Sequence, residues 1–333
     1  MIAHALPQVE STPTDAVKGD RSLPILLIGH GSRSAAGRQA IFDLAEAYRH
    51  VGPERPVIPC FLELTTPTIA DGVAECIRQG FVDVVVLPVL LFGARHNKFD
   101  VTCALDAMQQ RYPQVTFRYG APIGITSEIL AHLRAQLVGA QTHLSSTIAR
   151  AETAILFVGR GSSDPEANGE ACKLARMVWE GSGYQAMDVC FIGITHPRLN
   201  VGLQRSLLLQ PKRILVLPYL LFAGVLLDKT QDIVRECDRE HPEVEISCLP
   251  NLGIAPAILQ ALRTREREAI AGTIQMNCHL CKFRLAASEH SVPGHHHHGS
   301  NGHAHHHHDG ETDVAPDPMA IAAAYHQRAW QIP

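Results

Sequence analysis

Several features that would place a chain in a special class are scarce or missing in this sequence of 333 residues. The longest apolar run, Ile214–Leu227, has 14 residues and includes Pro218, whereas a membrane helix needs about 20. Aromatic residues make up only 5% and charged residues 19%, while hydrophobic residues reach 46%, which excludes collagen-like and wholly disordered chains. The formal net charge of −4 gives no basic field, so we expect neither a membrane nor a nucleic acid as partner.

Motifs of secretion, disulfide bonding and ATP use are also missing. The stretch 1–22 has no apolar core of a signal peptide and is predicted to be a flexible leader. The nine cysteines are scattered singly except for Cys278 and Cys281, without the rhythm of a disulfide framework, which favours a reducing, cytoplasmic location. No Walker loop is present, so no ATP is expected.

An internal repeat is present at an offset of 130 residues. The segment Ile25–Ser32 (ILLIGHGS) matches Ile155–Ser162 (ILFVGRGS). Two further pairs of segments match in the same order: Cys60–Pro67 with Cys190–Pro197, and Val86–Phe92 with Val216–Phe222. The chain is therefore predicted to contain two homologous halves.

Short β-branched runs alternate with helix-like stretches in each copy. In the first copy we expect strands at 25–28, 57–61, 82–87 and 115–119, and helices at 36–49, 68–79, 99–110 and from 127 onward. Continuous apolar strands between amphipathic helices predict an α/β fold with a parallel sheet in each half, covered by helices on both faces. The expected organisation is a leader at 1–22, an N-terminal half at 23–145, a C-terminal half at 150–267 and a tail at 268–333.

Polar residues that could carry chemistry follow three strands of the first copy. Parallel sheets bind ligands outside the carboxyl ends of their strands, which draws attention to His30, Glu63 and His96. His30 lies between two glycines that allow a sharp turn. Two imidazoles and a carboxylate suit a divalent metal of borderline softness, and they can also accept protons. Taken singly, each residue could instead be a structural or surface side chain.

The repeat supplies an internal control for these three residues. A residue with a structural role should be retained in both copies. The apolar residues are retained, but the three polar side chains are not. The second copy has Arg160 for His30, Gly193 for Glu63 and Leu226 for His96. The coordinated loss predicts one active centre, formed in the N-terminal half.

Three segments of the first copy resemble the class II tetrapyrrole chelatases, in particular the long form of the sirohydrochlorin cobaltochelatases. They are Gly29–Arg33 (GHGSR), Phe61–Pro67 (FLExxxP) and Leu91–Asp100 (LFGxxHxxxD). The resemblance covers roughly 23–265 and implies two flavodoxin-like halves with a tetrapyrrole in the cleft between them. It also implies ATP-independent insertion of Co²⁺, with His30 and His96 handling the metal and Glu63 as a further member of the catalytic site.

Sirohydrochlorin carries eight carboxylates, so cations near the ends of these loops are candidates for binding it. Each could equally be a solvated surface charge. The candidates are Arg33, Arg38, Arg95, Lys98 and Arg160.

The tail adds two candidate metal sites. Cys278 and Cys281 lie in a Met-x-Cys-x-x-Cys element that accompanies an iron–sulfur cluster in long-form relatives. Two thiolates cannot complete such a cluster, so other cysteines or a second subunit would have to contribute ligands; a redox-active or adventitious dithiol is the alternative. The second is a histidine-rich segment, predicted to be disordered and to store or deliver metal loosely. Its histidines are His295, His296, His297, His298, His303, His305, His306, His307 and His308.

These patterns predict a cytoplasmic cobalt chelatase that acts on sirohydrochlorin and divalent metal ions. Insertion of Fe²⁺ to give sirohaem uses the same motifs and is the nearest alternative. A non-catalytic metal-storage or metallochaperone protein is a second alternative, but it leaves the one-sided loss of His30, Glu63 and His96 unexplained. A homodimer remains open.

Overall fold

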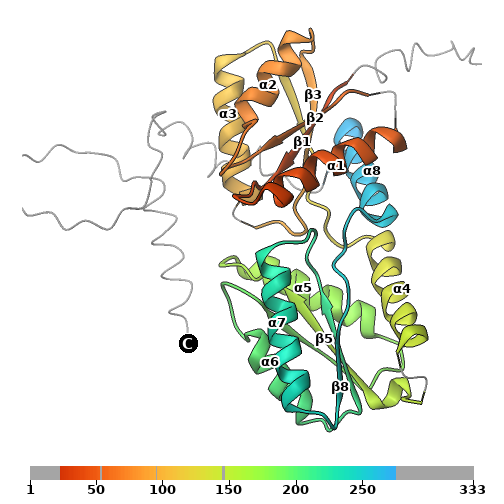
Figure 1. Cartoon of the computed structure of the whole chain (residues 1–333). Coiled ribbons are helices and arrows are strands. Elements are labelled where there is room, and N and C mark those ends of the chain that lie inside the picture. Colours follow the sequence, from red (N-terminus) through yellow and green to blue (C-terminus); the bar gives the residue numbers. More distant parts are fainter. Residues whose placement is uncertain (1–22, 53–54, 95, 145–146, 275–333) are drawn as a thin grey trace, which may run out of the picture.

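The computed structural model describes residues 23–52, 55–94, 96–144 and 147–274, and its chain runs through two similar halves in succession (Figure 1). The first half contains a four-stranded parallel sheet in the order β2-β1-β3-β4. Its elements are β1 (Ile25–Gly29), α1 (Ala35–Val51), β2 (Val57–Phe61), α2 (Ile69–Arg78), β3 (Asp83–Pro88), the π-helical turn η1 (His96–Asp100), α3 (Val101–Arg111), β4 (Thr116–Tyr119) and α4 (Ser127–His143).

The second half repeats this plan, with a parallel sheet in the order β6-β5-β7-β8. Its elements are the short helix η2 (Arg150–Glu152), β5 (Thr153–Gly159), α5 (Pro165–Trp179), β6 (Ala186–Phe191), α6 (Leu199–Leu207), β7 (Arg213–Pro218), α7 (Val225–Glu240), β8 (Glu245–Cys248) and α8 (Pro256–Ala271). The predicted α/β fold with two homologous halves is confirmed. None of the helices in the described part is long and apolar enough to span a bilayer.

The equivalence of the halves extends to individual backbone angles. Leu64 and Ile194, 130 residues apart, both have a positive φ, of 67° and 60°. The peptide bonds preceding Pro67 and Pro197 are both cis. The two halves therefore share the same backbone conformation at these equivalent positions.

The strands are apolar on both faces because helices cover both faces of each sheet. Leu26 and Ile28 of β1 pack with the α2 and α3 side, whereas Ile25 and Leu27 belong to a cluster on the opposite side. That second cluster continues into the other half, where it includes Phe157 of β5. One apolar core thus runs through both halves, flanked by one smaller cluster in each.

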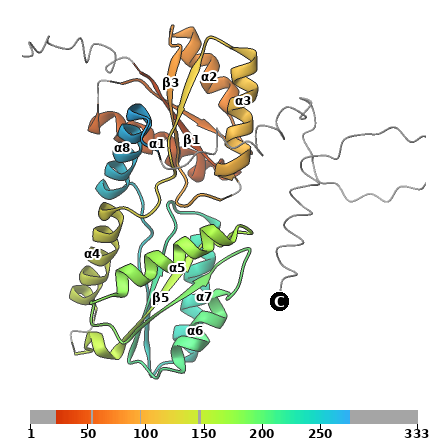
Figure 2. The same cartoon turned by 180° about the vertical axis from the view of Figure 1, so that it is seen from behind.

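The last helix of each half packs on the other half, which the repeat pattern does not predict. Helix α8 lies against α1, β3 and β4 of the first half, and α4 lies against α5 of the second (Figures 1 and 2). In the first half the α8 side chain of Glu266 accepts a hydrogen bond of 2.5 Å from the Tyr48 hydroxyl of α1. In the second half Tyr184 donates a hydrogen bond of 3.1 Å to the carbonyl of Leu137 in α4. The crossing helices join the two halves into one body.

The loops that follow β3 and β7 meet at the junction between the halves. The ring centroids of Phe92 and Tyr219 are 5.2 Å apart there. Tyr219 in turn stacks on Phe157 at 5.3 Å. The carboxyl ends of the two sheets therefore face each other, which is where a parallel sheet holds its ligand.

Candidate functional site

The loops after β1 and β2 are joined by a backbone hydrogen bond at the predicted site. The amide of Glu63 donates a hydrogen bond of 3.1 Å to the carbonyl of His30. Gly31 has φ +103°, and a Cβ there would stand 1.8 Å from the carbonyl oxygen of Glu63, so only glycine fits. The backbone of the two loops thereby holds His30 next to Glu63.

Their side chains also meet. His30 Nδ1 lies 3.5 Å from Glu63 Oε1, with the imidazole 22% and the carboxylate 46% exposed. A carboxylate beside one ring nitrogen helps to orient an imidazole and leaves the other nitrogen available. This part of the predicted site is therefore a solvent-accessible pair of polar groups at the carboxyl edge of the sheet.

His96 is the first residue of η1, which leads into α3. The prediction of a plain helix from Phe99 missed this π-helical turn. Asn97 is fully buried, and the Tyr119 hydroxyl lies within hydrogen-bonding distance of its carbonyl oxygen (2.9 Å) and its Oδ1 (2.6 Å). The Thr102 hydroxyl lies 2.9 Å from the carbonyls of Lys98 and Phe99. The backbone that carries His96 is thus anchored, although the His96 side chain lies outside the described part.

The second half has the same backbone hydrogen bond between its loops, but different side chains. The amide of Gly193 donates a hydrogen bond of 3.0 Å to the carbonyl of Arg160, and Gly161 has φ +87°. An exposed arginine stands where the first half has His30. Leu226, in the first turn of α7, takes the place of His96. Both halves therefore have the same hydrogen bond between these loops, but only the first half has imidazole and carboxylate side chains there.

The predicted substrate-binding cations have different surroundings. Arg33 and Arg160 are exposed on the loops after β1 and β5. Arg38 is exposed on the first turn of α1, and its Nη1 lies 3.4 Å from Thr65 Oγ1. Lys98 is partly buried and pairs with two carboxylates of the second half. Arg95 lies outside the described residues.

The predicted tail sites also fall outside the described residues. This applies to Cys278, Cys281 and every histidine of the histidine-rich segment. Within the ranges the structure does describe, no three histidine, cysteine or acidic side chains are grouped so that they could hold a metal ion.

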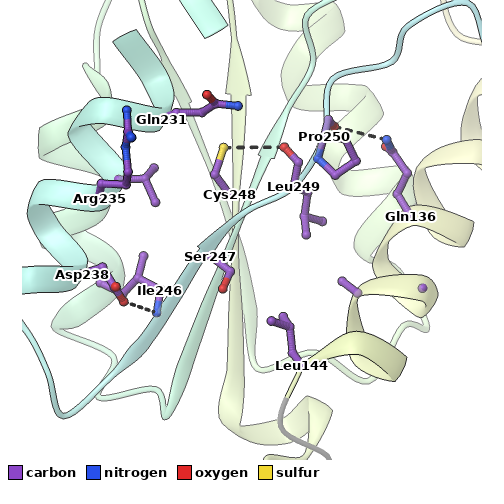
Figure 3. Close-up of a pocket in the computed structure, with 13 residues that line it drawn as sticks. Gln136, Leu144, Gln231, Arg235, Asp238, Ile246, Ser247, Cys248, Leu249 and Pro250 are labelled. Carbon is purple, nitrogen blue, oxygen red and sulfur yellow. Dashed lines mark hydrogen bonds between the residues drawn. The ribbon is translucent and has the colours of Figure 1, made fainter. Parts of the chain in front are cut away.

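A pocket of about 690 Å³ opens elsewhere, between α4, α7 and β8 (Figure 3). The repeat explains it, because Ser247 in its wall corresponds to Arg118 in the first half, as the strand register shows. Arg118 pairs with Asp83 at 2.7 Å and donates a hydrogen bond of 3.1 Å to the carbonyl of Ile270, which fills the equivalent space. The walls are mostly apolar and contain no histidine, and Arg235 is already paired with Asp232. The pocket suits neither a metal nor a polycarboxylate.

Two acidic residues near the site were missed from the sequence. Asp164 and Glu166, at the start of α5, are the partners of Lys98. The signal that could have found them is the asymmetry used for His30. Their repeat equivalents are Ser34 and Ala36, so these charges also occur in one copy only.

Comparisons with known proteins agree with this geometry. The CbiX family model matches residues 24–140 and 154–269. The sirohydrochlorin cobaltochelatase of Priestia megaterium is 35% identical over 80% of this chain and 86% of its own length. The sirohydrochlorin ferrochelatase of the same organism is 31% identical over 62% of this chain and 76% of its own length. The solved structure of SirB from Bacillus subtilis with Fe³⁺ superposes with a TM-score of 0.66 at 27% identity, covering 76% of this chain and 97% of SirB.

Proposed function

The chain belongs to the CbiX family, and from this membership we propose that it inserts Co²⁺ into sirohydrochlorin without ATP. The observation that carries the proposal is the contact of His30 with Glu63. A backbone hydrogen bond joins the loops of these two residues, and the second half repeats this bond between Arg160 and Gly193. A structural role would predict the same pair in both halves, whereas a single reaction centre predicts it in one half only. His30, Glu63 and His96 form the proposed centre.

Metal insertion requires that the ion lose water, reach the ring nitrogens and replace two pyrrole protons. Imidazole nitrogen and carboxylate oxygen are suitable ligands for Co²⁺ during its transfer. The Glu63 carboxylate is accessible and touches His30 Nδ1, so the pair can accept a proton as the metal arrives. The stability of the metal complex drives the reaction, which explains why no nucleotide is needed.

Arginines on the loops of both halves are proposed to bind the carboxylates of the macrocycle. Arg33 and Arg38 follow β1, and Arg160 follows β5 in the facing half. Guanidinium groups bind carboxylates through two parallel hydrogen bonds, which orients the substrate as well as holding it. The second half thus contributes binding, and the first half contributes metal and proton transfer.

The tail is proposed to serve metal supply outside the reaction centre. Nine imidazoles between His295 and His308 would raise the local metal concentration. The proposed reaction contains no iron–sulfur step, because its centre consists of His30, Glu63 and His96 and contains no cysteine. The buried thiols of Cys60, Cys76 and Cys190 form no disulfide, which is in keeping with the proposed reducing cytoplasm.

Sirohaem formation with Fe²⁺ is the second candidate, because a ferrochelatase is also among the similar proteins. The deciding experiment is anaerobic turnover of the full chain with sirohydrochlorin and Co²⁺, Fe²⁺ or Ni²⁺, followed by absorbance. Insertion without protein is subtracted as background. We expect the highest kcat/KM with Co²⁺. A preference for Fe²⁺ would establish the second candidate, and no insertion above background would leave only metal storage.

A further inference from the structure

Lys98 links the two halves next to the proposed centre. Its Nζ lies 2.8 Å from Asp164 Oδ2 and also contacts Glu166. The Lys98 side chain is 25% exposed and that of Asp164 is 14% exposed. Lys98 is two residues from His96 in η1, whereas both carboxylates belong to the first turn of α5. The contact therefore joins the turn that carries His96 to the opposite half.

Both ends of this link are anchored in their own half. On one side Asp164 caps α5 by accepting a hydrogen bond of 3.0 Å from the Glu166 amide. On the other side the turn is held by buried Asn97, and the Lys98 carbonyl accepts a hydrogen bond from the Thr102 hydroxyl. An ion pair between two ordered segments loses little side-chain freedom, so it can fix their relative position.

The link exists on one side of the junction only. In the second half the residue 130 positions after Lys98 is Asp228, and the residues 130 positions before Asp164 and Glu166 are Ser34 and Ala36. Asp228 is exposed and forms no ion pair with any described residue. The ion pair accompanies the half that carries the histidines, just as the contact of His30 with Glu63 does.

The charge of Lys98 is matched by that of its partners. The Lys98 ammonium group contacts both carboxylates, which neutralise its charge. A cation neutralised in this way attracts a polycarboxylate substrate less than an unpaired one would.

We infer that Lys98, Asp164 and Glu166 are positioning residues, which hold the His96 turn in place by tying it to the second half. This inference rests on the proposed function, because it concerns how His96 is presented to the metal. It assigns the second half a role in catalysis that needs no metal ligand there. It also replaces the expectation from the sequence that Lys98 binds substrate carboxylates.

The two roles of Lys98 predict opposite effects when its partners lose their charge. In the variant Asp164→Asn with Glu166→Gln, asparagine still caps α5, so the change removes charge and little else. If the ion pair positions His96, kcat falls and the KM for sirohydrochlorin stays the same. If Lys98 binds substrate, the variant releases its charge and the KM falls.

The test compares this double variant with Lys98→Met, Lys98→Arg and the triple combination of the double variant with Lys98→Met. We expect Lys98→Met and the double variant each to lower kcat about tenfold through misplacement of His96, with KM within about twofold of wild type. Lys98→Arg should keep most of kcat. The triple variant should have about the same kcat as Lys98→Met, because both remove the same ion pair and their effects do not add. Matched controls are Asp228→Asn, at the equivalent position, and Lys212→Met, which removes the surface ion pair with Glu152.

A second readout does not depend on turnover. Amide hydrogen exchange over 96–102 should become faster in Lys98→Met and in the double variant, and should be unchanged in both controls. Unchanged exchange, or a higher KM at constant kcat in Lys98→Met, would overturn the inference. Absence of metal insertion by the wild-type chain would refute the proposed function alone, since the exchange data still decide whether Lys98 holds the turn.

Discussion

The contact of His30 with Glu63 belongs to the residue scale, where a few side chains distinguish two nearly identical backbones. Gly31 and Gly161 both have a positive φ, and in each half a backbone hydrogen bond joins their loop to the neighbouring loop. The difference between the halves is therefore chemical. Substitutions at these positions should affect the reaction far more than the stability of the fold.

The first prediction concerns the two histidines. His30→Ala or His96→Ala should each lower metal insertion by about a hundredfold or more, because a proton acceptor and metal ligand is removed. The melting temperature should change little, since the His30 side chain is partly exposed. Steady-state turnover beside thermal unfolding by circular dichroism measures both effects. Arg160→Ala is the matched control and should raise KM without a comparable loss of kcat; near-normal turnover of His30→Ala would contradict the assigned site.

Glu266 of α8 is buried and ties the helix to the first half through polar contacts. It is 2% exposed and accepts hydrogen bonds from the Tyr48 hydroxyl and, at 2.6 Å, from Arg263. Arg55 pairs with it at 3.0 Å. Burial, together with the Glu266 carboxylate, raises the pKa of Tyr48, which therefore stays a neutral donor. A single carboxylate thus satisfies three donors between α1 and α8.

The second prediction follows from this arrangement. Glu266→Ala should lower the free energy of unfolding by about 3–5 kcal/mol, because it leaves partly buried cations and a phenol without their acceptor. Urea denaturation followed by circular dichroism measures the loss. Glu268→Ala, which breaks a more exposed pair with Arg265 on the same helix, is the control and should cost less than about 1 kcal/mol. Equal losses in the two variants would show that Glu266 has no special role.

At the scale of elements, the exchange of α4 and α8 is what joins the repeats. The face of the first sheet formed by Ile25, Leu27, Val85 and Leu87 belongs to the apolar core that α8 completes with Ile258 and Leu262. Helix α4 covers the second half with Leu133 and Leu137. Neither half therefore contains the helix that closes its own core.

The third prediction is that residues 23–147 alone do not fold cooperatively as a monomer. Without α8, about three turns of apolar helix surface are missing from the sheet, and exposed patches of that kind promote association. Size-exclusion chromatography and thermal unfolding of the fragment measure this. Mixing it with residues 148–274 should restore a cooperative transition. A fragment that melts cooperatively as a monomer would contradict the role given to α8.

At the scale of the whole molecule, three connections hold the carboxyl ends of the sheets opposite each other. They are the exchanged helices, the ring contact of Phe92 with Tyr219, and the pairing of Lys98 with the start of α5. All three connections are made by residues that precede the two sequence motifs of the tail.

The fourth prediction concerns the histidine-rich segment. Truncation before Gly294 should leave kcat at saturating Co²⁺ unchanged but raise the Co²⁺ concentration needed for half-maximal rate. The reason is that a segment rich in imidazole concentrates metal without contacting the transition state. Turnover measured across a metal titration tests this. A severalfold loss of kcat at saturating metal would place the segment in the mechanism.

The fifth prediction separates the cysteine pair from metal insertion. Cys278→Ser with Cys281→Ser should leave cobalt insertion largely intact, because the proposed centre lies in the first half. If the pair binds an iron–sulfur cluster, iron and labile sulfide measured after anaerobic purification should be lost in the same variant. Loss of insertion in a folded double variant would show that the tail governs the centre.

The sequence by itself determined the repeat, the α/β class and the polarity pattern of the site. The reason is that these features are encoded locally. Continuous apolar strands, glycines such as Gly31 in tight turns, and polar groups present in one copy only can be detected without knowing which segments touch. Strand positions followed from the sequence to within one or two residues, and the placement of His30 and Glu63 after their strands followed with them.

Only the tertiary structure decided which partner each element has. The apolar stripe of α4 predicts that one face is buried, but Leu133 and Leu137 carry no mark of the half against which they pack. The charge of Lys98 likewise does not specify whether it meets substrate or Asp164, because 66 residues separate the two side chains along the chain. Local sequence fixes periodicity and turn geometry, whereas contacts between distant segments depend on how the two sheets are oriented toward each other, and that orientation is set by packing throughout the molecule.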